Sequence, residues 1–314
     1  MTNVKNLFKS VFFGSDTRLR AFWRITLSIV LVMGGLILGS VLLMKINTPD
    51  FWIPIFSHLF GVASLLGCIY LLANYIDKRP LSEYGFNFSL VWWNDLLVGA
   101  LTGIVMMGAA FAISYSFGKV NIQAWISSSD GELFLPWLLV VLFGWTLVGI
   151  WEESLFRGIF IKNAAEGFTS LNLSSSLALF SAWVTSTLVF GLLHVPLGTV
   201  AEGVSMLNML IIWLALGGVL GLAYILTGEL AFPIGLHATI NFATNNLFFG
   251  DPKGSSNTPA LIRIQPTEFA NWTPHADLSV MVPVIIIGCG LILGWVYLRR
   301  GHVRLHTALT IWDN

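Results

Sequence analysis

The stretch from Gly149 to Phe160, GIWEESLFRGIF, places two adjacent carboxylates and an arginine inside an otherwise apolar run. On a helix, Glu153 and Arg157 are four residues apart and share a face, so they can form an ion pair that offsets part of their desolvation cost. Glu152 is rotated about 100° from Glu153 by the helical repeat. The spacing therefore predicts a supporting Glu153–Arg157 pair and a Glu152 that stays free for chemistry. The alternative is that all three lie at the end of a span and reach the lipid headgroups.

Two further pairs of residues have the same four-residue spacing within apolar segments. Phe190 and His194 share one helical face, and Pro196 predicts that the helix stops or kinks just after the histidine. His237 and Asn241 present an imidazole and an amide from one face of a later segment. Taken singly, such residues are typical of interfacial positions or of interhelical hydrogen bonds. Because ionisable groups inside a bilayer are costly and usually mark function, the three groups together predict one buried site.

The residue types in this set can hydrolyse an amide without a covalent intermediate. A carboxylate and a neutral imidazole can orient a water molecule and take its proton, while a second histidine and an asparagine can stabilise the oxyanion. The sequence contains neither the G-x-S-x-G nucleophile motif nor the H-E-x-x-H zinc motif. Glu152, His194 and His237 could instead hold a divalent metal such as zinc. The spacing leaves both interpretations open.

The composition is that of a membrane protein. Of the 314 residues, 56% are hydrophobic and only 10% are charged, whereas a soluble domain has about 25% charged residues. The formal net charge is zero, which gives no electrostatic basis for a nucleic-acid partner. We therefore expect a protein embedded in the lipid bilayer, with no nucleic acid bound.

Eight apolar stretches are long enough to cross a bilayer core about 30 Å thick. They are residues 22–44, 53–76, 96–117, 133–161, 175–196, 206–227, 230–249 and 278–298. This pattern predicts an all-α, polytopic membrane protein with about eight transmembrane helices and an active site within the helix bundle. The short turn at residues 227–229 leaves a seven-span arrangement open. We expect the polar segment from Asp251 to Asp277 to be an outer loop.

The distribution of basic residues predicts the orientation. With the N-terminus inside, the inner segments contain twelve of the 16 lysines and arginines, so the positive-inside rule places both termini in the cytoplasm. In this arrangement His194 is late in one outward-running helix and His237 is early in another. Straight, fully spanning helices would hold the two histidines at different depths. The helices must therefore break, tilt or start at different levels, and Pro196 and Pro233, each followed two residues later by a glycine, provide places for this.

The three motifs together resemble a known family. E-E-x-x-x-R at 152–157, F-x-x-x-H at 190–194 and H-x-x-x-N at 237–241 occur in this order on separate apolar segments. They are similar to the motifs of the CAAX prenyl protease type II and bacteriocin-processing (Abi, or CPBP) family of intramembrane endopeptidases, and the resemblance covers roughly residues 133–250. It implies that Glu152 activates water with His194 and that His237 and Asn241 form the oxyanion hole.

The resemblance also implies that Glu153, Arg157 and Phe190 support the site. Members of the family have been described both as glutamate-dependent, metal-independent proteases and as metalloproteases. We expect no cofactor, because no metal-binding motif of known spacing is present in the sequence. Zinc held by the catalytic glutamate and the two histidines is the alternative.

The predicted function is that of an intramembrane endopeptidase acting on membrane-associated peptides or proteins, either of the prenylated CAAX type or of the bacteriocin or leader type. The alternative is a non-enzymatic membrane immunity protein or a transporter that uses the buried glutamates, although the lack of an internal repeat counts against a transporter. We expect an N-terminal region of three spans at 1–132, a catalytic core at 133–250, and an outer loop, last span and cytoplasmic tail at 251–314. The expected location is a bacterial cytoplasmic membrane.

Overall fold

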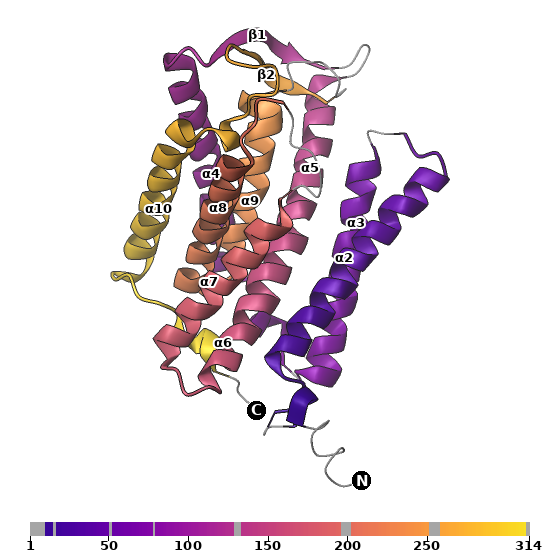
Figure 1. Ribbon diagram of the computed structural model, residues 1–314, viewed down its shortest axis with the longest axis vertical. Coiled ribbons are helices and arrows are strands. Elements are labelled where there is room, and N and C mark those ends of the chain that lie inside the picture. The colour runs from indigo at the N-terminus through magenta and orange to yellow at the C-terminus, as the bar shows by residue number, and fades with distance from the viewer. Residues whose placement is uncertain are drawn as a thin grey trace.

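The computed structural model describes residues 10–14, 17–49, 52–77, 79–128, 133–195, 202–250 and 258–311. Within these ranges the protein is a bundle of helices with one small sheet (Figure 1). Seven of the described helices are long and apolar enough to cross a membrane. They are α2 (Ala21–Lys45), α3 (Trp52–Leu71) with its π-helical end η1 (Leu72–Ile76), α4 (Leu90–Ser116), α5 (Phe134–Glu153) continued by η3 (Ser154–Ile161) and α6 (Lys162–Thr169), α7 (Ser175–Leu193), α8 (Met206–Thr227) and α10 (Leu278–Arg300). The predicted polytopic, all-α fold is confirmed.

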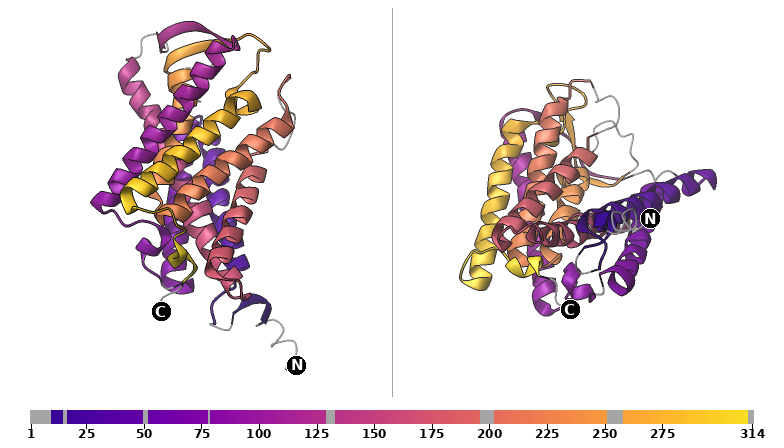
Figure 2. Two further views of the ribbon diagram at one scale, coloured as in Figure 1. Left: turned by 90° about the vertical axis from the view of Figure 1, so that its left-hand side faces the viewer. Right: turned by 60° about the horizontal axis from the view of Figure 1, so that its bottom comes forward.

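The segment expected as the seventh of eight spans lies at the centre of the bundle (Figures 1 and 2). It forms α9 (Ala231–Phe242) and the π-helical turn η4 (Ala243–Phe248), and every residue of α9 except Asn241 is buried. Two glycines allow the flanking helices to approach α9 closely. A Cβ on Gly99 of α4 would lie 2.2 Å from the carbonyl oxygen of Phe232, and one on Gly149 of α5 would lie 2.8 Å from that of Ile234. Small residues at such contacts let helix backbones pack together in a bilayer.

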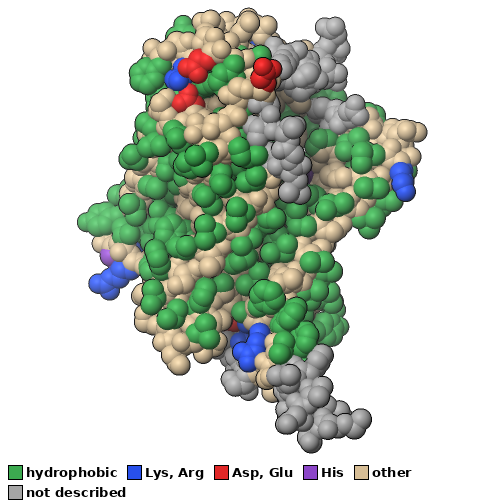
Figure 3. Space-filling model, in the orientation of Figure 1, with side chains coloured by type: hydrophobic (Ala, Val, Ile, Leu, Met, Phe, Trp, Pro, Cys, Tyr) green, Lys and Arg blue, Asp and Glu red, His purple; other side chains and the backbone are tan. Residues whose placement is uncertain are grey.

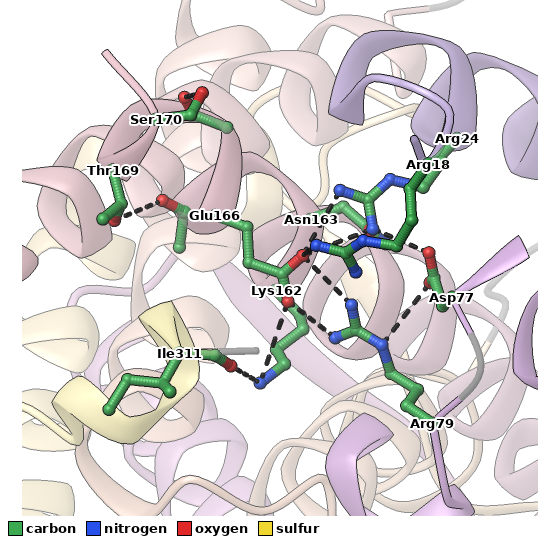
Figure 4. Close-up of polar contacts among 12 residues, drawn as sticks. Arg18, Arg24, Asp77, Arg79, Lys162, Asn163, Glu166, Thr169, Ser170 and Ile311 are labelled. Carbon is green, nitrogen blue, oxygen red and sulfur yellow. Dashed lines mark hydrogen bonds and ion pairs between the residues drawn. The ribbon is translucent and has the colours of Figure 1, made fainter. Parts of the chain in front are cut away.

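Buried charges join α2 to the rest of the bundle near the end that holds both termini (Figures 1 and 4). Arg24 of α2 lies 2.6 Å from Asp77, and Arg79 lies 2.8 Å from Glu166 of α6. Lys162 donates a hydrogen bond of 2.8 Å to a backbone carbonyl of the C-terminal segment. Because unlike charges buried together offset part of their desolvation cost, several basic residues expected on the inner side act here as structural ties.

A two-stranded sheet lies at the opposite end of the molecule (Figure 1). β1 (Val120–Ser127) and β2 (Ala260–Pro266) pair antiparallel, with Ile122 opposite Ile264. The sequence predicted only a loop here, because pairing between segments so far apart in the chain has no local signal beyond a short two-residue alternation. Residues 251–257 of the expected outer loop lie outside the described residues, as do Pro196 and Gly198.

The surface matches a lipid-facing belt. Figure 3 shows hydrophobic side chains over the middle of one face, with charged side chains toward its ends and margins. Leu90, Leu133 and Leu298 are 84%, 73% and 80% exposed, which is unfavourable in water and favourable in lipid. The protein is therefore an integral, multi-pass membrane protein.

Candidate active site

The two adjacent glutamates lie where α5 changes its hydrogen-bonding pattern. α5 ends at Glu153, and the π-helix η3 begins at Ser154. π-helical turns are rare and occur frequently at functional sites. Glu152 is 7% exposed and Glu153 is fully buried. Neither carboxylate therefore extends to the surface of the protein.

Glu153 connects an arginine of η3 with a histidine of α9. Its Oε1 accepts a hydrogen bond from Nη1 of Arg157 at 3.0 Å and lies 2.6 Å from Nδ1 of His237. An ionised carboxylate only accepts hydrogen bonds, so Nδ1 of His237 carries a proton and donates it to this contact. The Glu153–Arg157 pair is the one that the helical spacing predicted. The contact with His237 was not predicted.

Arg157 is held by three groups. Besides Glu153, its Nη2 donates to the carbonyl oxygen of Gly217 in α8 at 3.0 Å, and its Cζ lies 4.3 Å from the centroid of the Phe190 ring. A guanidinium over an aromatic face is a favourable cation–π contact. Phe190 thus contributes a ring to Arg157 and, through its backbone, an oxygen to His194, whose Nδ1 lies 2.8 Å away.

Two imidazoles face one oxygen of Glu152. Nε2 of His194 lies 3.6 Å from Oε2 of Glu152, and Nε2 of His237 lies 3.8 Å from the same oxygen. The Nδ1 atoms of both rings donate to other oxygens, since neither a carbonyl nor a carboxylate can donate back. Both separations exceed a direct hydrogen bond and suit a gap bridged by one water molecule. Among the described residues, Oε2 of Glu152 has no hydrogen-bond partner.

These side chains border a cavity of about 400 Å³ inside the bundle. Asn241, the least buried residue of α9, lines it as well. The structure therefore brings the four residues predicted to be catalytic to one cavity, with the three predicted supporting residues beside them. The apolar part of the lining includes Trp145, Trp213, Leu216 and Leu220.

Two histidines that no sequence motif singled out line the same cavity. His58 belongs to α3, and its Nδ1 lies 3.3 Å from Nε1 of Trp151. His275 belongs to η5 (Pro274–Ala276), and burial lowers its pKa to about 4. Both lie outside residues 133–250. In the sequence, each of the two was visible only as a single histidine among apolar or weakly polar residues.

The expected difference in depth between the two histidines predicted to be catalytic is resolved by where their helices begin. His194 follows the 19 residues of α7, whereas His237 is the seventh residue of α9. At a rise of about 1.5 Å per residue, the histidines lie about 28 Å and about 9 Å along their helices. α7 begins at the lower end of the molecule in Figure 1, beside α6. α9 therefore begins closer to the site than α7 does.

Within the described part of the chain, no three His, Cys, Asp or Glu side chains form a group that could hold a metal ion. The zinc alternative requires Glu152, His194 and His237 to act as such a group. We therefore derive no step through a metal.

The fold and the cavity define a class: helical membrane proteins in which a buried carboxylate and two histidines from different helices meet inside the bundle. Residues 134–243 match the family model described as type II CAAX prenyl endopeptidase Rce1-like. This stretch contains all the predicted site residues and confirms the resemblance carried by the three motifs. No curated protein and no solved structure gives a significant match to the chain. The matched segment is thus similar to a CAAX-type membrane protease.

Proposed function

We propose that this protein is an intramembrane endopeptidase that hydrolyses a peptide bond with water activated by Glu152 and His194. One observation carries the proposal: the Nε2 atoms of His194 and His237 lie 3.6 and 3.8 Å from one buried oxygen of Glu152. A water molecule between these atoms can donate one hydrogen bond to the carboxylate and one to a neutral imidazole. Such a water is both oriented and next to its base.

The two histidines have different roles because their Nδ1 partners differ. His194 donates from Nδ1 to the uncharged carbonyl of Phe190, so Nε2 is the unprotonated nitrogen of the neutral ring and can accept a hydrogen bond from water. His237 donates from Nδ1 to the Glu153 carboxylate at 2.6 Å, and when the ring carries both protons its Nε2–H faces Glu152. Its second proton, on Nε2, can then be donated to a developing oxyanion, with the amide of Asn241 as a further donor.

The reaction consumes only water and peptide. The water oxygen attacks the scissile carbonyl carbon while Glu152 takes its proton, which gives a tetrahedral intermediate. Collapse of this intermediate breaks the C–N bond, and Glu152 returns the proton to the leaving nitrogen. The first products are a carboxylic acid and an amine, and the acid then gives its remaining proton to the amine, which leaves as an ammonium group. Glu153 and Arg157 hold His237 in place and take no proton from the substrate.

The lining of the cavity favours an apolar, membrane-associated peptide or protein as substrate. Its wall carries Trp145, Trp213 and Leu216, which suits lipid-modified CAAX-type peptides or apolar leader-type peptides. We further propose that both termini face the cytoplasm of a bacterial cell and that residues 133–250 form the catalytic core. Residues 1–132 and 251–314 complete this core, because His58 and His275 line the same cavity.

Mass spectrometry of membrane peptides tests the function. Cells expressing the wild-type protein are compared with cells expressing Glu152→Gln, and with cells expressing Glu268→Gln, which changes an exposed carboxylate. We expect new peptide ends in the wild type and in Glu268→Gln that are lost in Glu152→Gln. Identical peptide ends in all three, at equal protein levels, would refute the proposal.

A further inference from the structure

His58 is held in one tautomer by the residue that precedes Glu152. Nε1 of Trp151 lies 3.3 Å from Nδ1 of His58. An indole nitrogen can only donate a hydrogen bond, so Nδ1 of His58 accepts and the proton of the neutral ring is on Nε2. This is the opposite of His194 and His237, whose Nδ1 atoms donate.

The same contact keeps His58 neutral. Protonation would place an N–H on Nδ1 directly against the indole N–H, and a donor opposed to a partly buried donor loses its hydrogen bond. Trp151 is only 5% exposed, so water does not easily replace the lost partner. His58 therefore presents a neutral Nε2–H donor at the cavity that it lines.

The helical repeat places His58 on the far side of Glu152 from His237. Successive residues of a helix are rotated by about 100°, so Trp151 and Glu153 point in nearly opposite directions from α5. Trp151 contacts His58 of α3 and Glu153 contacts His237 of α9. Glu152 points between them. The donor of His58 is thus separated from the group that stabilises the oxyanion.

We propose that His58 is a substrate-binding residue that donates a hydrogen bond from Nε2 to a peptide carbonyl oxygen other than the scissile one. The proposal rests on the proposed peptidase function and adds a specificity contact from α3, outside the segment that matches the family model. A neutral donor suits this task, because a peptide carbonyl is uncharged and the cavity wall is largely apolar. The contact fixes the peptide on one side of Glu152 while His237 and Asn241 bind the oxyanion on the other.

Steady-state kinetics of the full-length protein in lipid bicelles test the contact. The probe is an internally quenched, prenylated CAAX-type peptide. We expect His58→Ala to raise KM about tenfold, the effect of losing one neutral hydrogen bond, with kcat changed less than about twofold. His58→Gln should recover part of the loss, because its amide can donate. The matched control is His302→Ala, at an exposed histidine beyond α10.

A second experiment tests the tautomer of His58. Trp151→Phe removes the indole donor, so His58 can take a second proton and KM should acquire a dependence on acidic pH that the wild type lacks. The double variant His58→Gln/Trp151→Phe should lack it. The other titratable side chains that line the cavity, Glu152, His194, His237 and His275, are present in every variant. α2, which packs against α3, carries only Arg24 and Lys45, near its two ends.

The possible outcomes distinguish a failure of the His58 inference from a failure of the proposed peptidase function. If the wild type does not cleave the probe, or if Glu152→Gln cleaves it, the peptidase function fails and the inference fails with it. If cleavage depends on Glu152 but His58→Ala lowers kcat at an unchanged KM, or leaves both unchanged, only the inference is overturned. ¹⁵N NMR of histidine-labelled wild type adds a readout that needs no turnover. An unprotonated Nδ1 in His58 supports the proposal, and an imidazolium at pH 6 overturns it.

Discussion

Glu153→Gln should destabilise the protein and Glu152→Gln should not, although the residues are adjacent and the substitution is the same. Glu153 is fully buried and pairs with Arg157, which is 1% exposed, at 3.0 Å. Replacing Glu153 by an amide removes the ion-pair partner that this buried guanidinium contacts directly. Oε2 of Glu152, by contrast, has no hydrogen-bond partner among the described residues, so an amide there loses little and lowers the desolvation cost.

The size of the effect follows from the contacts that remain. Removing one partner of a buried ion pair costs about 3–5 kcal/mol. Arg157 keeps the carbonyl of Gly217 at 3.0 Å and the ring of Phe190 at 4.3 Å, and the glutamine oxygen can still accept one hydrogen bond. We therefore expect the lower end, about 3 kcal/mol. With an unfolding entropy of about 2.1 cal/mol/K per residue, a chain of 314 residues should lose about 5 °C in Tm.

Thermal unfolding in detergent, followed by tryptophan fluorescence, measures the difference. Glu152→Gln is the matched control and should unfold within about 2 °C of wild type or above it. The double variant Glu153→Gln/Arg157→Met removes both charges and should recover at least half of the loss in Tm, because no arginine is then left buried without its ion-pair partner. Equal Tm values for the two single glutamine variants, or a double variant no more stable than Glu153→Gln, would refute the reasoning.

Three further predictions use different measurements. Burial lowers the pKa of His275 to about 4 in the folded protein, against an ordinary value of 6.5 for an exposed histidine. Because the unfolded state binds this proton more readily, the free energy of unfolding should fall as pH drops from 6.5 toward 4. The fall should be less steep in His275→Gln. Peptide cleavage by the purified protein should survive exhaustive chelation, measured as unchanged kcat/KM, and activity that is lost and then restored by zinc would favour the metal mechanism. Thiol labelling of Asn121→Cys and His302→Cys in sealed vesicles should modify the first only from outside and the second only from the cytoplasmic side; the reverse pattern would invert the proposed orientation.

The parts of the site that were predictable from sequence are those fixed by the helical repeat. The pair Glu153–Arg157 forms at the predicted four-residue spacing, and Phe190 and His194 share a face, with their ring centroids 4.2 Å apart. Local spacing determines such contacts even though α5 passes into a π-helix after Glu153. The convergence of three helices at one cavity was not derivable from the helical repeat and was predicted from the cost of ionisable groups in a bilayer and from the family resemblance.

The missed features are non-local. β1 pairs with β2 across more than a third of the chain, and His58 reaches the cavity from a helix whose sequence reads simply as an apolar span. Periodicity reports which face of a segment is apolar, but it does not say which distant segment will cover that face. The depth of α9 in the bundle is also not visible in the sequence, because the level at which the helix begins depends on its close contacts with glycines of α4 and α5.

Three consecutive residues of α5 face three different surroundings because each is rotated about the helix axis relative to the one before it. Steps of about 100° per residue direct Trp151 to His58 of α3, Glu152 into the cavity, and Glu153 to His237 of α9. The two glutamates therefore have different contacts because their side chains point in different directions. Glu153 is fully buried against His237 and Arg157, whereas Glu152 lines the cavity. The same rotation gives the cavity an acceptor at its centre and a histidine on each side, one whose Nδ1 accepts from an indole and one whose Nδ1 donates to a carboxylate. A peptide bound between them would be oriented by that difference before any proton moves.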